Sequence, residues 1–248
     1  MRATALPRND PAQYDGLAEQ WWNPAGGFAM LHWFAASRAE HIPPAAPGQV
    51  LVDLACGGGL MAPYAARLGY RHVGVDLGRP GLDLARERGV LAVQASVLAV
   101  PLADGCADVV VAGEILEHVA DDVGVLAECA RLLRPGGTLV IDAIAATRLA
   151  SLIAVRIAER IPGGPPPGIH DPALFVDRKR LLAAADRLGL DLRLVGWRPS
   201  VRDVVAWRLG RRGTVRMKEL SITAVLFAGY GRKRDERREP GAARTVGG

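Results

Sequence analysis

The 248-residue chain is predicted to be an α/β protein with a doubly wound, mostly parallel sheet of seven strands. Short aliphatic runs alternate with helix-compatible segments, the order that places helices on both faces of a parallel sheet. The first run ends in Gly57-Gly58-Gly59 and the second ends in Asp76. The spacing from Gly57 to Asp76, 76 − 57 = 19 residues, leaves room for one helix between two parallel strands.

The expected strands are aliphatic or β-branched runs bounded by glycine, proline or acidic residues. They are Val50–Leu54, Val73–Asp76, Leu91–Gln94, Ala107–Ala112, Thr138–Asp142, Asp191–Trp197 and Ile222–Tyr230. Helices are expected between them at Leu60–Leu68, Gly81–Glu87, Asp122–Leu133 and Arg178–Leu188. The helix after Asp121 has an acidic N-cap candidate, and it stops at the Pro135-Gly136-Gly137 sequence.

Prolines divide the chain into three parts. Residues 1–47 form a helical leader with helix-compatible pieces at Pro11–Gln20 and Gly27–His41. Residues 48–231 form the α/β domain, which carries an insertion at about residues 144–177 after the fifth strand. The mixed charges and small residues of 232–248 indicate a disordered tail.

Composition excludes several classes of protein. Hydrophobic residues make up 50% of the chain and charged residues 23%, as in ordinary globular proteins. No apolar run reaches the roughly 18 residues of a membrane-spanning helix, and the N-terminus lacks the apolar segment of a signal peptide, so a cytoplasmic location is expected. Three cysteines without metal-type pairing argue against a disulfide framework. The net charge of +5 comes from scattered arginines, so no nucleic-acid partner is expected.

The glycine turn is typical of a nucleoside-binding site. Glycines allow a ligand to lie against the backbone, and an acid at the tip of the next strand can accept hydrogen bonds from a ribose diol. A dinucleotide fingerprint would tolerate Ala62 at its sixth position. Asp53, however, lies in the strand end before the glycines and would repel a pyrophosphate. The turn therefore favours a nucleoside ligand over a dinucleotide.

Glu114, Glu117 and His118 follow directly on the fourth predicted strand, at the edge where ligands bind in doubly wound sheets. If this segment turns helically, their i, i+3 and i+4 spacing brings them to one side. The three side chains could hold a divalent cation such as Mg²⁺, or one of them could remove a phenolic proton. The alternative is structural: a carboxylate caps a nearby helix and the histidine binds a backbone carbonyl.

Several motifs resemble those of known methyltransferases. Asp53–Gly59 followed by Val73–Leu77 resembles motifs I and II of class I S-adenosylmethionine (SAM)-dependent methyltransferases. The order of the motifs along the chain, to about Lys233, resembles the ubiquinone-biosynthesis O-methyltransferase family, which methylates polyprenylated catechols in quinone biosynthesis. The motifs that carry this second resemblance are Tyr14–Pro24, Leu31-His32, Arg38, Asp53–Gly59, Glu114–His118, Gly168–Pro172 and Phe175-Val176.

The resemblance implies SAM as the cofactor and assigns residues to it. Arg38 would reach the carboxylate of SAM from the leader, which would fold over the cofactor as a lid, and Asp76 would bind the ribose hydroxyls. Ala55 replaces a more usual glycine, and Ser96 stands where many class I enzymes have an acid. Glu114, Glu117 and His118 match the family's divalent-metal ligands. The other cofactor-binding positions that the resemblance implies are Asp53, Gly57, Gly59, Leu77, Val97 and Gly113.

The first half of the insertion, residues 147–161, has apolar residues at i, i+4 spacing and arginines on its other sides. An arginine-bearing amphipathic helix can lie in a lipid headgroup layer, and the resemblance implies such a peripheral membrane contact at the inner face of the membrane. The other interpretation is a lid helix that packs on its own domain. Both remain open.

The sequence thus predicts a SAM-dependent O-methyltransferase with a small-molecule acceptor, phenolic or catechol-like and, by the resemblance, a polyprenylated quinone precursor. The acceptor oxygen would attack the sulfonium methyl group in line, and without a metal His118 or Glu117 would act as the general base. One alternative is a small-molecule or natural-product methyltransferase that acts on O, N or C. The other is a donor-binding module without turnover. The sequence does not indicate an oligomeric state.

Overall fold

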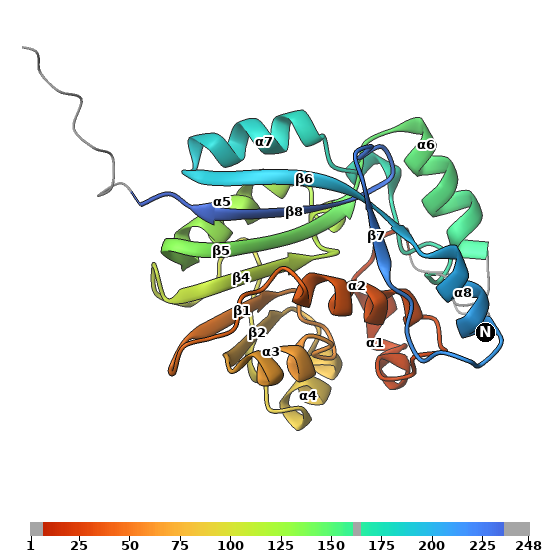
Figure 1. The fold of residues 1–248 in the computed structure, drawn as a ribbon, viewed down its shortest axis with the longest axis horizontal. Helices are drawn as coiled ribbons and strands as arrows, with labels where there is room; N and C mark the ends of the chain where they lie inside the picture. Colours follow the sequence, from red (N-terminus) through yellow and green to blue (C-terminus); the bar gives the residue numbers. More distant parts are fainter. Residues whose placement is uncertain (1–6, 161–164, 236–248) are drawn as a thin grey trace, which may run out of the picture.

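The computed structural model describes residues 7–160 and 165–235, and its centre is one sheet of eight strands. The strand order is β3-β2-β1-β4-β5-β8-β6-β7 (Figure 1). Strands β1 to β5 pair in parallel, β8 lies antiparallel between β5 and β6, and β7 pairs antiparallel with β6. The predicted α/β fold with a mostly parallel sheet is confirmed.

The strands and helices have the following bounds. The strands are β1 Val50–Leu54, β2 Arg71–Asp76, β3 Leu91–Gln94, β4 Ala107–Gly113, β5 Leu133–Ile144, β6 Leu190–Pro199, β7 Met217–Leu220 and β8 Leu226–Lys233. The α-helices are α1 Ala12–Asp15, α2 Ala29–Ala39, α3 Ala62–Leu68, α4 Arg79–Glu87, α5 Asp122–Leu132, α6 Arg148–Ser151, α7 Arg178–Arg187 and α8 Val201–Arg208. Shorter turns lie at Ala18–Gln20, Leu116–His118, Ala158–Arg160 and Pro172–Leu174, and a π-helical stretch at Leu152–Ile157.

The sheet has eight strands, one more than the seven predicted from the sequence. All seven predicted strands are present, but the last begins at Leu226 rather than Ile222. The extra strand, β7, pairs with β6 at the edge of the sheet and contains Lys218 and Glu219. Charged residues are common on edge strands, which pair on one side only. The aliphatic pattern used for the other strands could not find it.

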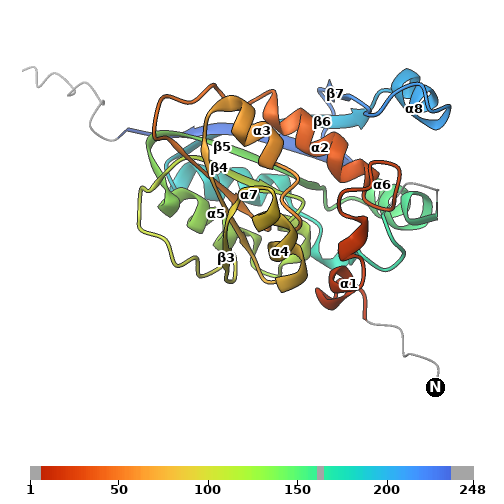
Figure 2. The same cartoon turned by 90° about the horizontal axis from the view of Figure 1, so that it is seen from below.

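Alternate residues of the central strands pack on opposite faces of the sheet. Leu51 and Val109 belong to a buried cluster with residues of α2 and α3. Their neighbours Val52 and Val110 belong to the cluster formed with α5 and α7. Figure 2 shows these two helix pairs on opposite sides of the sheet. The near-continuous apolar strands of the sequence are therefore explained by burial on both faces.

The first part of the insertion is helical from Arg148 to Arg160, as an α-helical turn, a π-helical stretch and a 3₁₀ turn in succession. Thr147 caps it, because its Oγ1 accepts a hydrogen bond of 2.9 Å from the Ala150 backbone N–H. Ala150 and Ala154 pack on the domain, whereas Leu152 is 47% exposed. Residues 161–164 of the insertion lie outside the described residues.

Segments far apart in the sequence meet at one end of the sheet. Figures 1 and 2 place α1 of the leader, α6 of the insertion and α8 together at this end.

At the other end β8 continues to Lys233, whose Nζ donates to the carbonyls of Ala130 and Leu133. Of the predicted tail 232–248, residues 236–248 lie outside the described residues. In the described part of the chain, no helix combines the length and the apolar character needed to cross a bilayer.

Candidate active site

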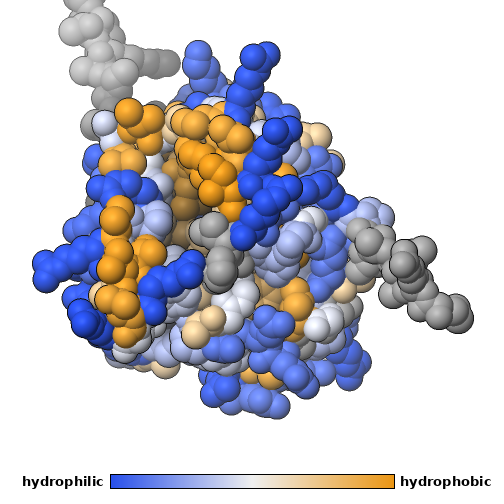
Figure 3. Space-filling view, turned by 90° about the vertical axis from the view of Figure 1, so that its right-hand side faces the viewer, coloured by the Kyte–Doolittle hydropathy of each residue, from blue (hydrophilic) through white to orange (hydrophobic). Residues whose placement is uncertain are grey.

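A cavity of about 760 Å³ lies at the carboxyl ends of the parallel strands, within the range of small-molecule sites. One half is lined by the strand ends and the turns that follow them. The other half is apolar and is lined by the leader, the insertion and the segment before β8. Figure 3 looks onto this end of the molecule, where apolar side chains border a hollow.

Nearly all predicted cofactor-binding residues line this one cavity. Gly59 is the exception: a Cβ there would lie 3.0 Å from the Cβ of Ala85, so its function is close packing against α4. The residues that do line the cavity are Arg38, Asp53, Ala55, Gly57, Asp76, Leu77, Ser96, Val97 and Gly113.

Asp76 is held at the end of β2 by backbone donors. Its two carboxylate oxygens accept hydrogen bonds of 2.8 Å from the backbone N–H groups of Gly57 and Gly78. Burial raises the pKa of Asp76, while these two hydrogen bonds act to lower it. A carboxylate has about four acceptor positions, so further donors can still bind.

Arg38 and Asp142 form a buried ion pair across the cavity floor. Nε and Nη2 of Arg38 donate to the two carboxylate oxygens of Asp142. Burial alone would lower the pKa of Arg38, but Asp142 outweighs it and the pKa is raised. The guanidinium lies against Gly113, where a Cβ would be 2.1 Å from Cζ. Gly113 is therefore required for the position of Arg38.

The two tryptophans of the leader fasten it to the glycine turn. The Trp21 ring covers Gly57, where a Cβ would approach the ring to 2.3 Å. Trp22 Nε1 donates a hydrogen bond of 2.9 Å to the carbonyl of Gly58. Both tryptophans belong to the Tyr14–Pro24 motif that carries the family resemblance, but the sequence did not predict which residues they contact.

The predicted metal ligands Glu114, Glu117 and His118 do not form a three-ligand group in the described part of the chain, so the structure does not support a divalent cation there. Glu114 and His118 line the cavity, but Glu117 is fully buried beneath it and accepts a hydrogen bond of 3.0 Å from the Ile144 backbone N–H. Within residues 7–160 and 165–235, no three His, Cys, Asp or Glu residues form a group that could hold a metal ion. The spacing argument assumed an α-helix, whereas only Leu116–His118 turns, as a single 3₁₀ turn, and Glu114 precedes it with φ of 55°.

Burial sets the protonation of these three groups. Burial raises the pKa of Glu117 to about 8 and raises that of Glu114 well above its ordinary value. Burial, with His170 nearby, lowers the pKa of His118 to about 3, so this imidazole is neutral at pH 7. Glu114 Oε1 and Glu117 Oε2 are buried with no hydrogen-bond partner in the described part of the chain.

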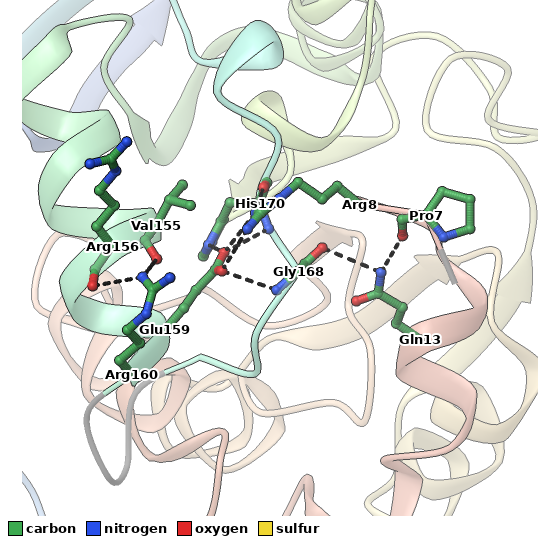
Figure 4. Close-up of polar contacts among 9 residues, drawn as sticks. All are labelled: Pro7, Arg8, Gln13, Val155, Arg156, Glu159, Arg160, Gly168 and His170. Atoms are coloured by element: carbon green, nitrogen blue, oxygen red, sulfur yellow. Dashed lines mark hydrogen bonds and ion pairs between the residues drawn. The ribbon is translucent and has the colours of Figure 1, made fainter. Parts of the chain in front are cut away.

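A strap formed by residues 7–13 ties the leader to the insertion, and Figure 4 shows its contacts. Arg8 pairs with both carboxylate oxygens of Glu159, at 3.3 and 3.2 Å, and also donates to the carbonyl of His170. Glu159 is buried and accepts further hydrogen bonds from the backbone N–H groups of Gly168 and His170. Burial acts to raise the pKa of Glu159, but these hydrogen bonds outweigh it and lower the pKa.

The strap also reaches the predicted catalytic histidine. Asn9 hydrogen-bonds both the ring and the backbone carbonyl of His118, and the ring of His170 stacks on that of His118 at 5.5 Å. Sequence reasoning missed Arg8, Asn9 and Glu159, because no periodicity or motif marks single polar residues whose partners are 100 or more positions away.

The apolar half of the cavity is built from the leader, the insertion and the ends of three strands. The leader contributes aromatic rings, the insertion contributes branched aliphatic side chains, and the ends of β5, β6 and β8 complete the wall. The large residues on this side are Phe28, Leu31, Phe34, Ile144, Leu149, Ile153, Trp197 and Leu226.

Known proteins resemble the chain in both sequence and fold. The family described as "Methyltransferase domain" matches residues 52–141. The ubiquinone biosynthesis O-methyltransferase of Ralstonia nicotianae is 36% identical over 200 residues, which are 76% of this chain and 84% of that protein. The protein of the same name from Cupriavidus pinatubonensis is 36% identical over 198 residues, covering 75% and 80%.

A solved structure resembles the fold. A SAM-dependent methyltransferase of Thermotoga maritima, described as a possible histamine N-methyltransferase, superposes with a TM-score of 0.64 over 89% of this chain and 98% of its own. Its sequence identity of 18% supports the fold alone. The sequence relatives, together with the domain match, identify this chain as an enzyme: it is a SAM-dependent methyltransferase and belongs to the ubiquinone biosynthesis O-methyltransferase family.

Proposed function

We propose that the enzyme methylates a hydroxyl group of a phenolic, catechol-like quinone precursor that carries a polyprenyl chain. The observation that supports this acceptor best is the apolar half of the cavity, built from aromatic and branched aliphatic side chains. A small polar acceptor would leave this surface exposed to water, whereas an isoprenoid chain would cover it. The printed names of the relatives agree with an acceptor of this class.

The polar half of the cavity fits SAM. Nη1 of Arg38, with no hydrogen bond to any described residue, is available for the carboxylate of SAM, and Asp76 has acceptor positions left for ribose hydroxyls. Leu77 is 56% exposed and lines the same half, where an adenine ring could cover it. Residues 7–47, held over the glycine turn by Trp21 and Trp22, act as the lid.

His118 is the base in this proposal. When bound, SAM supplies a sulfonium methyl group, which the acceptor oxygen takes as the carbon–sulfur bond breaks and its electron pair stays on sulfur. The neutral imidazole of His118 accepts the phenolic proton. Its low pKa suffices because the phenolic proton becomes more acidic as the oxygen–carbon bond forms. Glu117 does not line the cavity and supports β5 instead.

Transfer of labelled methyl groups to a panel of acceptors tests the acceptor class. Catechol, catechols with one or two prenyl units, and simple amines would be compared by kcat/KM. Each buried CH₂-sized group stabilises the complex by about 0.8 kcal/mol, so one prenyl unit should raise kcat/KM at least about tenfold. Equal rates with and without the chain would contradict the proposal, and a preferred amine would favour a natural-product methyltransferase that acts on nitrogen.

We also propose that the end of the molecule around the cavity contacts an anionic membrane at its inner face. Leu149, Leu152 and Ile157 of the 147–161 segment are each nearly half exposed. On α8 the exposed residues Val201, Val205 and Leu209 recur every four positions. Exposed arginines adjoin both groups, at positions 148, 156, 160, 198, 202 and 211. A surface with apolar residues among cations fits a bilayer of anionic headgroups.

Co-sedimentation with vesicles tests the membrane contact. Binding to vesicles with anionic lipid should fall severalfold in a Leu152→Asp, Val205→Asp double variant. Leu182→Asp is the matched control, since Leu182 is a comparably exposed apolar residue on α7. Equal binding of the double variant and the parent enzyme would refute the membrane contact and leave the segment as a lid helix.

A further inference from the structure

Asn9 makes two hydrogen bonds to one residue, His118, from a position 109 residues away. Its Nδ2 donates to the backbone carbonyl of His118 at 2.9 Å, and its Oδ1 lies 2.5 Å from Nδ1 of the imidazole. The side chain therefore contacts both the backbone and the ring of the proposed base.

The backbone carbonyl determines how the amide and the ring must be protonated. A carbonyl oxygen can only accept, so the Asn9 atom that faces it must be the NH₂ group. The amide oxygen of Asn9 then faces Nδ1 of His118, and because it too can only accept, Nδ1 must carry the proton. In a neutral imidazole this leaves the lone pair on Nε2. No residue that the structure describes hydrogen-bonds this Nε2.

From this geometry we infer that Asn9 is a positioning residue that holds His118 in the Nδ1–H tautomer, with Nε2 free to accept the phenolic proton. The inference rests on the proposed role of His118 as the base. It goes beyond that role, because it assigns a function to a leader residue that touches no reacting atom.

The backbone conformation of Asn9 and the hydrogen bonds beside it hold its side chain against His118. Asn9 has φ of 59°, in the left-handed region that asparagine tolerates better than most residues. Its backbone N–H donates to the carbonyl of Gly168 at 3.0 Å, and the Arg8–Glu159 ion pair holds the strap at the next residue. Figure 4 shows the contacts on either side of Asn9, from Arg8 to Glu159 and from Gln13 to the carbonyl of Gly168.

The other groups that face the His118 ring cannot fix its tautomer. The ring of His170 stacks on that of His118 with the centroids 5.5 Å apart and the planes tilted by 27°, and the described residues show no hydrogen bond between the two rings. The Tyr14 ring meets His118 edge-on at 6.3 Å. Substitution of Asn9 is therefore the way to test control of the His118 tautomer.

Two substitutions separate tautomer control from a merely structural contact. Asn9→Asp keeps an acceptor for Nδ1–H but has no donor for the His118 carbonyl, whereas Asn9→Ala removes both. We expect Asn9→Ala to lower kcat roughly tenfold to a hundredfold, a fraction of a typical general-base contribution. Asn9→Asp should retain kcat within about threefold, and both variants should keep the KM for SAM. If the contact only held the backbone, the two variants would be equally impaired.

Nitrogen-15 NMR of the histidine rings reads the tautomer without any activity measurement, with His118→Gln to assign the signal. The parent enzyme and Asn9→Asp should show Nδ1 protonated, and Asn9→Ala should show a mixture. An Nε2–H tautomer in the parent enzyme, or no change in Asn9→Ala, would overturn the inference. Asn23→Ala, which removes another asparagine of the leader, is the control and should change nothing. Full activity of His118→Gln would instead refute the proposed base.

Discussion

In the glycine turn, Ala55 stands where a glycine is more usual, and its backbone has a conformation that favours glycine. Its φ of 56° is in the left-handed region, which costs a residue with a Cβ roughly 1–2 kcal/mol. The sequence showed only that Ala55 replaces a more usual glycine. The structure adds that the backbone itself is strained, although the cavity stays open beside it.

Relief of this strain gives a prediction at the same residue. Ala55→Gly should raise the free energy of unfolding by about 1 kcal/mol, because glycine adopts positive φ without penalty. Urea unfolding of the two proteins measures this difference. Ala65→Gly, in helix α3, is the control and should lower stability, since glycine is unfavourable in a helix interior. A loss of stability in Ala55→Gly would contradict the assigned strain.

Gly113 makes possible the close approach of Arg38. A Cβ at this position would overlap the guanidinium, so Gly113→Ala should displace Arg38 from Asp142. We expect SAM affinity to fall at least about tenfold, and stability to fall by a few kcal/mol because Asp142 is left buried without its cation. Calorimetric titration with SAM and thermal unfolding measure the two effects. Unchanged affinity would mean that Arg38 does not bind the donor.

Glu117 should make stability depend on pH. Its pKa is raised from 4.5 to about 8 in the folded protein, so folding favours the protonated form. Its contribution to stability is therefore fully present below pH 4.5 and is lost as pH rises to 8. Glu117→Gln mimics the protonated form, so its stability relative to the parent enzyme should increase between pH 5 and pH 8. A difference that stayed constant with pH would contradict the raised pKa.

At the scale of elements, the sequence predicted those that have a repeating pattern. The parallel strands were found because each is an aliphatic run buried on both faces, and α5 was found through its cap, since Asp121 accepts a 2.8 Å hydrogen bond from the Gly124 N–H. The edge strand β7 and helix α8 were missed, because both are short and mix apolar with charged residues. The glycine turn and Asp76 were likewise recognisable from local spacing.

The strap was not predictable, since its function depends on contacts across the fold. Glu159 is a single acid in an arginine-bearing segment, and only the folded chain brings Arg8, Gly168 and His170 to it. The predicted metal ligands show a related limit. Their helical spacing did not place Glu114, Glu117 and His118 in one three-ligand group in the described part of the chain, because the backbone between Glu114 and His118 is not an α-helix.

Release of the strap is a prediction for this element. Glu159→Ala leaves the backbone donors of Gly168 and His170 without partners, which costs about 1–3 kcal/mol for buried groups. Hydrogen exchange should therefore accelerate at the amides of Asn9 and Gly168 and stay unchanged in β1 and β4. Arg156→Ala, on the same segment, is the control. Protection of these amides that matches the parent enzyme would show that Glu159 does not hold the strap.

For the whole molecule, the exposed arginines around the cavity give the proposed membrane contact an electrostatic component. The chain has a net charge of +5, and salt screens charges at distances beyond a Debye length of about 10 Å at 0.1 M. Sedimentation with anionic vesicles should therefore weaken as salt rises from about 0.1 M to about 0.5 M. Binding that strengthened with salt would indicate an apolar contact alone.

The leader, the strand ends and the insertion all converge on His118, so this residue is the most direct test of the account. Single-turnover transfer of a labelled methyl group to a prenylated catechol would be measured for the parent enzyme and for His118→Gln, together with SAM binding. The account predicts that His118→Gln binds SAM within about threefold of the parent enzyme and loses about 10²–10⁴-fold in transfer rate. Transfer at the parent rate by His118→Gln would contradict it.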